Sequence, residues 1–223
     1  MIPWETLGSA PLPGGGELRL KRRGAEFSIM LGANALMNSR LSGSEEALAT
    51  LTAARLATRD APRILIGGLG MGFTLRAALA IFDADARIIV AELVPQVVAW
   101  ARGPMANLFA GCLDDARVDV AVSDVGALIA AAPPGYDAIL LDVDNGPDGL
   151  TVAGNDALYG EAGLAATRAA LDPDGVLAVW SQGPDRSFTQ RLKRAGFAVE
   201  EVTVRAGRGG RGKRHVIWLA KRC

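Results

Sequence analysis

Acidic side chains gather in one short segment of the chain, where they could take part in proton transfer. Asp142 ends the apolar run Tyr136–Leu141, and Asp144 and Asn145 come just after it. A carboxylate that is partly buried beside a second carboxylate has a raised pKa, so it can accept a proton near neutral pH. Asp142 and Asp144 are therefore candidate catalytic residues. The alternative is an Asx-rich turn that precedes Pro147.

A glycine-rich turn, Gly67–Gly72, follows the apolar run Arg63–Ile66 and precedes a helix-forming stretch that begins at Phe73. Glycine lets the backbone approach a ligand closely, so a strand, a glycine turn and a helix can cradle a nucleotide-like ligand. A dinucleotide fingerprint would need glycine in place of Phe73, and a P-loop would need Lys-Ser or Lys-Thr after the glycines. The spacing instead resembles motif I of class I S-adenosylmethionine-dependent transferases; a turn without a ligand is the alternative. The candidate cofactor-binding glycines are Gly67, Gly68, Gly70 and Gly72.

Two further strand ends carry residues that suit an adenosine group. Glu92 ends the predicted strand 87–91, where its carboxylate could accept hydrogen bonds from both ribose hydroxyls. Asp124 follows the predicted strand 117–122 and could accept a hydrogen bond from the adenine amine, while the N–H of Val125 could donate to a ring nitrogen. The alternatives are a solvated helix cap at Glu92 and a plain N-cap at Asp124.

The elements that must position these residues alternate between strand-like and helix-like stretches from residue 62 onward, which predicts an α/β fold with a parallel sheet. Residues 205–213, which join the last two strands, are too few for a crossover helix, so these strands should pair antiparallel. The expected strands are 63–66, 87–91, 117–122, 137–142, 175–180, 197–204 and 214–220, and the expected helices are 73–82, 94–102, 124–131, 157–171 and 186–195.

The first 40 residues predict a separate N-terminal part. Residues 1–16 are rich in proline and glycine and are expected to be irregular, while 17–21 and 26–31 predict a β-hairpin. A helix should start near Ser42 and run through Ala47–Ala57. The predicted domains are thus 1–40, a lead-in with a hairpin, and 41–223, a Rossmann-like transferase domain.

Composition narrows the classes of function. Among 223 residues, 24 Lys and Arg balance 24 Asp and Glu, so net charge favours neither nucleic acid nor membrane. Two distant cysteines make no disulfide framework, and no signal peptide or membrane helix is evident, which favours a cytoplasmic location. The single histidine, His215, argues against a histidine metal site and is interpreted as a structural or rim residue.

Taken together, these segments resemble the spermidine synthase family, the polyamine aminopropyltransferases and their relatives. The resemblance covers residues 63–183 and adds an N-terminal hairpin before a glutamate-bearing helix. It implies a seven-stranded class I methyltransferase sheet with a C-terminal antiparallel hairpin. It also places Leu93 beside Glu92 at the cofactor, where Asp142 would face the reactive sulfonium as a further cofactor-binding residue. The matching segments are Gly67–Gly72, Ala91–Val98, Asp115–Gly126, Tyr136–Asp142, Leu158-Tyr159 and Leu171–Leu177.

The resemblance also implies the acceptor side of the site. Asp142 matches the family's proton-accepting acid, whereas the second acid of that family's motif falls on Asn145, and Asp144 lies one residue early. Fewer acids than a polyamine requires favour a small-molecule methyltransferase that uses S-adenosylmethionine. The alternatives are an aminopropyltransferase that uses decarboxylated S-adenosylmethionine and a non-catalytic nucleoside-binding or scaffolding protein. The candidate substrate-binding residues are Asn145, Tyr159, Glu46 and Trp180.

A basic, glycine-rich loop occupies residues 205–214. Its cations could border the substrate mouth and attract an anionic acceptor, or they could contact a nucleic-acid backbone. We favour a solvated hairpin tip, because no aromatic residue interleaves the loop. The expected partner is a small-molecule acceptor, with a homodimer as a further expectation from the family resemblance.

Overall fold

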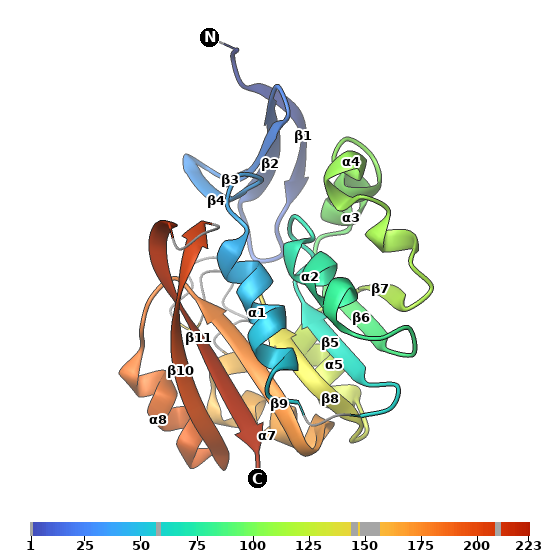
Figure 1. Cartoon of the computed structure of the whole chain (residues 1–223). Helices are drawn as coiled ribbons and strands as arrows, with labels where there is room; N and C mark the ends of the chain where they lie inside the picture. Colours follow the sequence, from blue (N-terminus) through green and yellow to red (C-terminus); the bar gives the residue numbers. More distant parts are fainter. Residues whose placement is uncertain (1, 57–58, 144–146, 148–156, 208–210) are drawn as a thin grey trace.

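The computed structural model describes residues 2–56, 59–143, 147, 157–207 and 211–223. Within these residues the strands form a four-stranded sheet and a seven-stranded sheet (Figure 1). The strands are β1 (Glu5–Pro11), β2 (Glu17–Arg23), β3 (Glu26–Leu31), β4 (Asn34–Asn38), β5 (Arg63–Gly67), β6 (Arg87–Glu92), β7 (Val118–Val122), β8 (Tyr136–Leu141), β9 (Leu171–Ser181), β10 (Phe197–Gly207) and β11 (Arg211–Arg222). The helices are α1 (Gly43–Ala53), α2 (Phe73–Ile81), α3 (Pro95–Arg102), α4 (Ala106–Phe109), α5 (Val125–Ala131), α7 (Glu161–Ala170) and α8 (Arg186–Arg194), with the 3-10 helix η1 (Cys112–Asp114).

The larger sheet has the strand order β10-β11-β9-β8-β5-β6-β7 within the described part of the chain. Strands β5 to β9 pair in parallel, whereas β11 pairs antiparallel with both β9 and β10. The predicted class I methyltransferase sheet with an antiparallel C-terminal hairpin is thereby confirmed. The parallel order arises because the βα connections carry each strand back to the same edge of the sheet.

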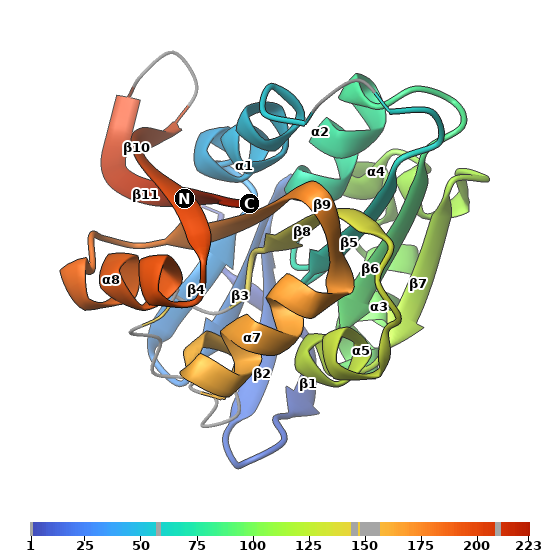
Figure 2. The ribbon, with the colours of Figure 1, turned by 90° about the horizontal axis from the view of Figure 1, so that it is seen from below.

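Helices cover both faces of this sheet, which explains why its strands are continuous apolar runs (Figure 2). Ile64 and Ile66 of β5 point into the core formed with α1, α2 and α3, while Leu65 between them points into the core formed with α5, α7 and α8. The same alternation holds in β8, where Leu140 belongs to the first core and Leu141 to the second. No helix of the described residues is both long enough and apolar enough to cross a bilayer.

The N-terminal part is an antiparallel sheet of the order β1-β2-β3-β4 within the described residues, rather than a hairpin alone. The predicted hairpin is β2 and β3, but residues 5–11, expected to be irregular, form β1 and pair with β2. The register of this pairing shifts between Thr6 and Gly8, which is an irregularity of the β-bulge type. Gly8 lies against the indole of Trp100 on α3, so a side chain at this position would collide with that ring.

The order in which the chain adds strands to the sheet reverses between β5 and β8. From β5 it proceeds to β6 and β7 on one side, and from β8 to β9 on the other. Such a switch point opens a crevice at the carboxyl ends of the strands, where ligands of open α/β sheets bind. In Figure 1 the N-terminal sheet lies above these strand ends and covers them.

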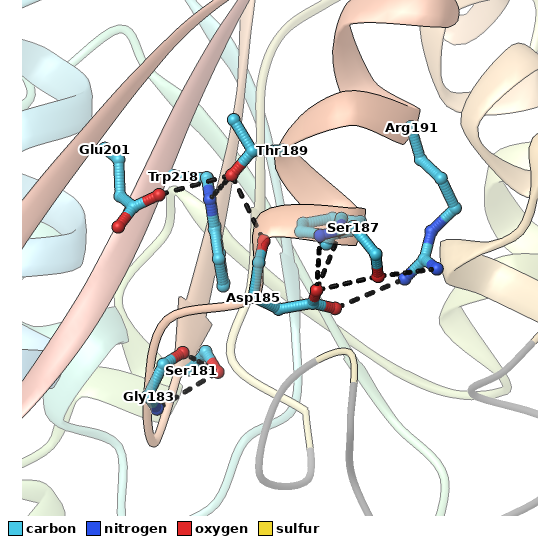
Figure 3. A network of polar contacts seen from close by, with 9 residues as sticks. Ser181, Gly183, Asp185, Ser187, Thr189, Arg191, Glu201 and Trp218 are labelled. Carbon is cyan, nitrogen blue, oxygen red and sulfur yellow. Dashed lines mark hydrogen bonds and ion pairs between the residues drawn. The ribbon is translucent and has the colours of Figure 1, made fainter.

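A polar network fixes the turn that follows β9 (Figure 3). Asp185 caps α8 and accepts hydrogen bonds from the backbone N–H groups of Ser187 and Phe188. Thr189, one turn into the helix, accepts a hydrogen bond of 2.9 Å from Nε1 of Trp218 on β11. The helix is therefore fastened both to its own entry turn and to the sheet, which holds the end of β9 in place.

Candidate active site

A cavity of about 190 Å³ lies at the switch point, between the carboxyl ends of β5, β6 and β8 and the N-terminal sheet. Its roof is apolar and comes from the N-terminal part, for which the sequence predicts only a hairpin. Its floor consists of the glycine turn and the acidic strand ends. The apolar side chains of the roof are Leu12, Leu18, Ile29, Leu36 and Met37.

The glycine turn lines the cavity through Gly68 and Gly70. Gly68 has φ +90°, and a side chain there would collide with the backbone oxygen of Asp142. Gly70 has φ +50°, and a Cβ atom would lie 3.2 Å from Sδ of Met37. The turn can thus approach both the neighbouring strand and the roof, which keeps the cavity narrow at this point.

The other two candidate glycines have structural positions outside the cavity lining. The carbonyl of Gly67 accepts a hydrogen bond of 2.9 Å from the N–H of Asp142, which joins the ends of β5 and β8. Gly72 is the N-cap of α2, and a side chain there would meet the ring of Phe109. These two glycines shape the turn and are not among the described residues that line the cavity.

Glu92 lies at the end of β6, lines the cavity and is 8% exposed. Its Oε2 accepts a hydrogen bond of 3.0 Å from the N–H of Leu69, and its Oε1 accepts one of 2.9 Å from the N–H of Val94. Burial raises the pKa of Glu92, while these backbone donors lower it. The carboxylate is held rigidly, with its remaining lone pairs able to accept from a ligand.

The adenine-binding candidates also lie at the cavity. Leu93, Asp124 and Val125 line it, at the ends of β6 and β7. Asp124 is the N-cap of α5, and its Oδ1 accepts a hydrogen bond of 2.8 Å from the N–H of Ala127. The N-cap alternative is therefore what the structure contains, and it leaves the second carboxylate oxygen of Asp124 for a ligand.

Asp142, at the end of β8, meets two side chains from the helices on the opposite wall. Its Oδ2 accepts a hydrogen bond of 2.7 Å from Oγ1 of Thr74, on α2. Burial, together with the charge of Glu45 on α1, raises the pKa of Asp142 to about 7, although the Thr74 hydrogen bond lowers it. Burial likewise raises the pKa of Glu45. Two carboxyl groups that share one site in this way are suited to hold a single proton between them.

Glu45 was not among the candidate site residues, whereas its neighbour Glu46 was. Glu45 lines the cavity, but Glu46 does not; its Oε1 accepts a hydrogen bond of 2.9 Å from Oγ of Ser42 at the start of α1. Helical spacing could have distinguished them, because Glu45 shares a face with the buried Leu48, Ala49 and Thr52. Thr74 was also missed, since no charge or motif marks it.

The remaining candidates for substrate binding differ in whether they line the cavity. Trp180, at the end of β9, lines the cavity. Tyr159 does not line it; the ring is 2% exposed and packs edge-on against Phe188, with 5.5 Å between centroids. Asp144 and Asn145 lie outside the described residues.

The basic loop continues the strands β10 and β11, whose pairing includes Arg205 with Arg214 and Gly207 with Arg211. Its carbonyl groups lie against the start of α1, because a Cβ atom on Gly43 would be 3.0 Å from the oxygens of Arg205 and Gly207. Residues 208–210 are not described. The parts of the loop that belong to β10 and β11 thus border the helix that carries Glu45.

Comparison with curated proteins finds relatives that are named polyamine aminopropyltransferases. A polyamine aminopropyltransferase of Mycobacterium tuberculosis is 30% identical over 198 residues, which are 84% of this chain and 36% of that protein. Polyamine aminopropyltransferase 2 of Pseudomonas aeruginosa is 31% identical over 144 residues, which are 62% of this chain and 38% of that protein. The chain therefore spans little more than a third of the length of these relatives. No family model matches the chain.

Solved structures agree on the fold. A spermidine synthase from Thermotoga maritima has a TM-score of 0.77 at 18% identity and covers 98% of this chain and 73% of its own. A spermidine synthase in complex with the transition-state analogue AdoDATO has a TM-score of 0.76. A precorrin-6y C5,15-methyltransferase from Geobacter metallireducens matches less well, at 0.54 over 78% of this chain. The names of the curated relatives favour the aminopropyltransferase alternative over the methyltransferase that the sequence departures favoured.

Proposed function

We propose that this chain, which is a spermidine synthase-like protein with a class I methyltransferase fold, transfers an aminopropyl group from decarboxylated S-adenosylmethionine to an amine. The observation that carries the proposal is the pair Glu45 and Asp142 at one end of the cavity. The names of the curated relatives support the same reaction class.

The charges around the cavity support a cationic donor. Every charged side chain that the described residues contribute to its lining is a carboxylate: Glu45, Glu92, Asp124 and Asp142. A sulfonium nucleoside with an amine tail would meet four acids at the strand ends and α1, below the apolar roof of the cavity. S-adenosylmethionine also carries an α-carboxylate, which would meet like charges here and no Lys or Arg of the described lining.

The donor half of the site would hold the nucleoside through residues of three strand ends. The backbone at Gly68 and Gly70 lets a ligand approach closely, and Glu92 would accept hydrogen bonds from the ribose hydroxyls. Asp124 and the N–H of Val125 would bind the adenine edge. These groups are fixed before a ligand arrives, because Glu92 and Asp124 are already held by backbone donors.

The acceptor half would manage the proton. The nitrogen of the acceptor bonds to the propyl carbon next to sulfur, the carbon–sulfur bond breaks and its electron pair remains on the sulfur of the leaving thioether. The nitrogen must also lose a proton, and Asp142, with a pKa raised to about 7, is able to take it. Thr74 orients the accepting carboxylate, and Glu45 stabilises the positive charge on the amine.

Two alternatives remain as outcomes of the test. Methyl transfer from S-adenosylmethionine would use the same nucleoside site and the same proton acceptor. A non-catalytic nucleoside-binding protein would bind the donor without turning it over.

The test is a comparison of the two donors by calorimetry and by product analysis with amine acceptors. We expect tighter binding of decarboxylated S-adenosylmethionine and release of methylthioadenosine. Release of S-adenosylhomocysteine from S-adenosylmethionine would establish methyl transfer instead. Binding of either donor without product, over a panel of amines, would establish the non-catalytic alternative, and failure to bind either would refute every version.

A further inference from the structure

A hydrogen-bonded chain of side chains leads from strand β11 to the acidic pair. His215 Nδ1 lies 2.9 Å from Oγ of Ser44, at the start of α1. The Ser44 hydroxyl in turn donates a hydrogen bond of 2.7 Å to Oε2 of Glu45. Ser44 is fully buried, so no water competes for its hydroxyl. His215, Ser44 and Glu45 thus connect strand β11 with the cavity.

The single proton of the serine hydroxyl determines the direction of the chain. Because Ser44 donates to Glu45, its oxygen can only accept from His215, so Nδ1 of the imidazole must carry a hydrogen. The neutral imidazole is then the Nδ1–H tautomer. The doubly protonated imidazolium would carry the same hydrogen, so the chain persists in both protonation states.

The surroundings hold the imidazole in this orientation. The ring of Trp180 on β9 packs against it at 4.7 Å between centroids and an interplanar angle of 76°. Ser44 faces it from α1, Val204 is its pairing partner on β10, and Arg205 pairs with Arg214 next to it. Burial and the charge of Lys213 lower the pKa of His215, so the ring is neutral at pH 7.

We propose that His215 and Ser44 are positioning residues that hold the carboxylate of Glu45 toward Asp142. Glu45 sits on the first turn of a helix, where a glutamate has several rotamers open to it. The hydrogen bond from Ser44 selects one of them, and His215 fixes the hydroxyl that makes this bond. The assignment of a role to Glu45 rests on the proposed function, whereas the hydrogen-bond chain does not.

A direct test measures the tautomer of His215 by nitrogen-15 NMR. The chain has one histidine, so imidazole labelling yields one spin system. We expect the Nδ1–H tautomer at pH 7 to 8 and a redistribution between the tautomers in Ser44→Ala. A dominant Nε2–H tautomer in the unmodified protein would overturn the proposal, because Ser44 would then have to donate to His215. This readout needs no turnover, so it stands even if the proposed function fails.

A kinetic test uses the geometry of amide side chains. The amide nitrogen of His215→Asn takes the place of Nδ1 and can still donate to Ser44, whereas that of His215→Gln takes the place of Nε2. We expect His215→Asn to keep kcat within about threefold and His215→Gln to lose about tenfold. The pH profile should be unchanged in His215→Asn, since the imidazole does not titrate in the proposed role.

The control is Lys213→Gln, which removes a charge from the same strand and leaves the hydrogen bond to Ser44 intact. It should match the unmodified protein in kcat. Equal losses in His215→Asn and His215→Gln would overturn the proposal, because the donor at Nδ1 would then be irrelevant.

Discussion

Glu92 and Asp142 end the two strands that flank β5, and the difference between them shows how one sheet edge supports two kinds of carboxylate. Both carboxyls line the same cavity, and burial raises the pKa of each. Glu92 accepts hydrogen bonds from two backbone N–H groups. Asp142 accepts one from the hydroxyl of Thr74 and faces the carboxyl of Glu45.

These partners act in opposite directions on the two groups. Backbone N–H groups can only donate, so they favour the charged form of Glu92 and make it a fixed acceptor. Burial, and after it the charge of the second carboxyl, disfavour the charged form of Asp142 and raise its pKa to about 7. A position at a strand end therefore does not decide whether an acid binds or titrates; its immediate neighbours decide.

The comparison of Glu92 with Asp142 predicts that a substitution at Asp142 has the largest effect on turnover. Asp142→Asn keeps the size of the side chain and can still accept from Thr74, but it cannot take up a proton. We expect turnover to fall by about 100-fold or more, the usual range for loss of a general base. Affinity for the donor nucleoside, measured by calorimetry, should change by less than about threefold. A variant that keeps full turnover would remove Asp142 from the reaction.

The second effect is expected at Glu92 and should have the opposite character. Glu92→Gln places an amide where the carboxylate accepts from Leu69 or Val94, so one backbone N–H loses its partner. We expect donor affinity to fall by about 10- to 100-fold, the range for a lost hydrogen bond to a charged group. Turnover at saturating donor should fall much less. If Glu92→Gln lowered turnover and spared affinity, the division of labour between the two strand ends would be wrong.

Much of this edge could be predicted from sequence, because each parallel strand is an apolar run that stops abruptly. Gly67, Glu92 and Asp142 come at such stops, and the parallel arrangement brings these stops to one edge. Strand β1 was missed, since its glycine and the nearby prolines weaken the strand signal. The N-terminal roof could not be predicted for the same reason, and with it the apolar half of the cavity.

The sequence motifs do not predict the pairing of Glu45 with Asp142. Glu45 reaches the cavity because α1 packs against α2 and the sheet. The residues around position 45 do not by themselves predict either of these contacts. The resemblance implies a glutamate on this helix, but it does not distinguish Glu45 from Glu46. The two differ only in the direction that each side chain takes from the helix. Tyr159 was assigned from a matching segment, and the fold turns its ring into the core beside Phe188.

A smaller effect concerns stability and pH. The pKa of Asp142 is raised from its ordinary 3.8 to about 7, so between these values the folded protein binds more protons than the unfolded chain. Stability from this group must therefore fall as pH rises from about 4 to about 7. Asp142→Asn removes that loss, and we expect its melting temperature to exceed the unmodified protein's at pH 8, by about 2–4 °C for each kcal/mol of the loss. At pH 4 the two proteins should melt together; a constant offset would contradict a raised pKa.

The smallest effect is expected at Glu46, with Glu45 as its matched comparison. Both are glutamates on the first turn of α1, but only Glu45 lines the cavity, and Glu46 bonds to Ser42. Glu45→Gln should therefore lower kcat/KM for the acceptor by about tenfold, whereas Glu46→Gln should stay within about twofold and cost at most about 1 kcal/mol of stability. Steady-state kinetics with varied acceptor separates them. Equal losses in both variants would mean that the total acidity of the helix start matters, and not the direction in which one side chain points. The pairing of Glu45 with Asp142 would then not explain the effect on turnover of the acceptor.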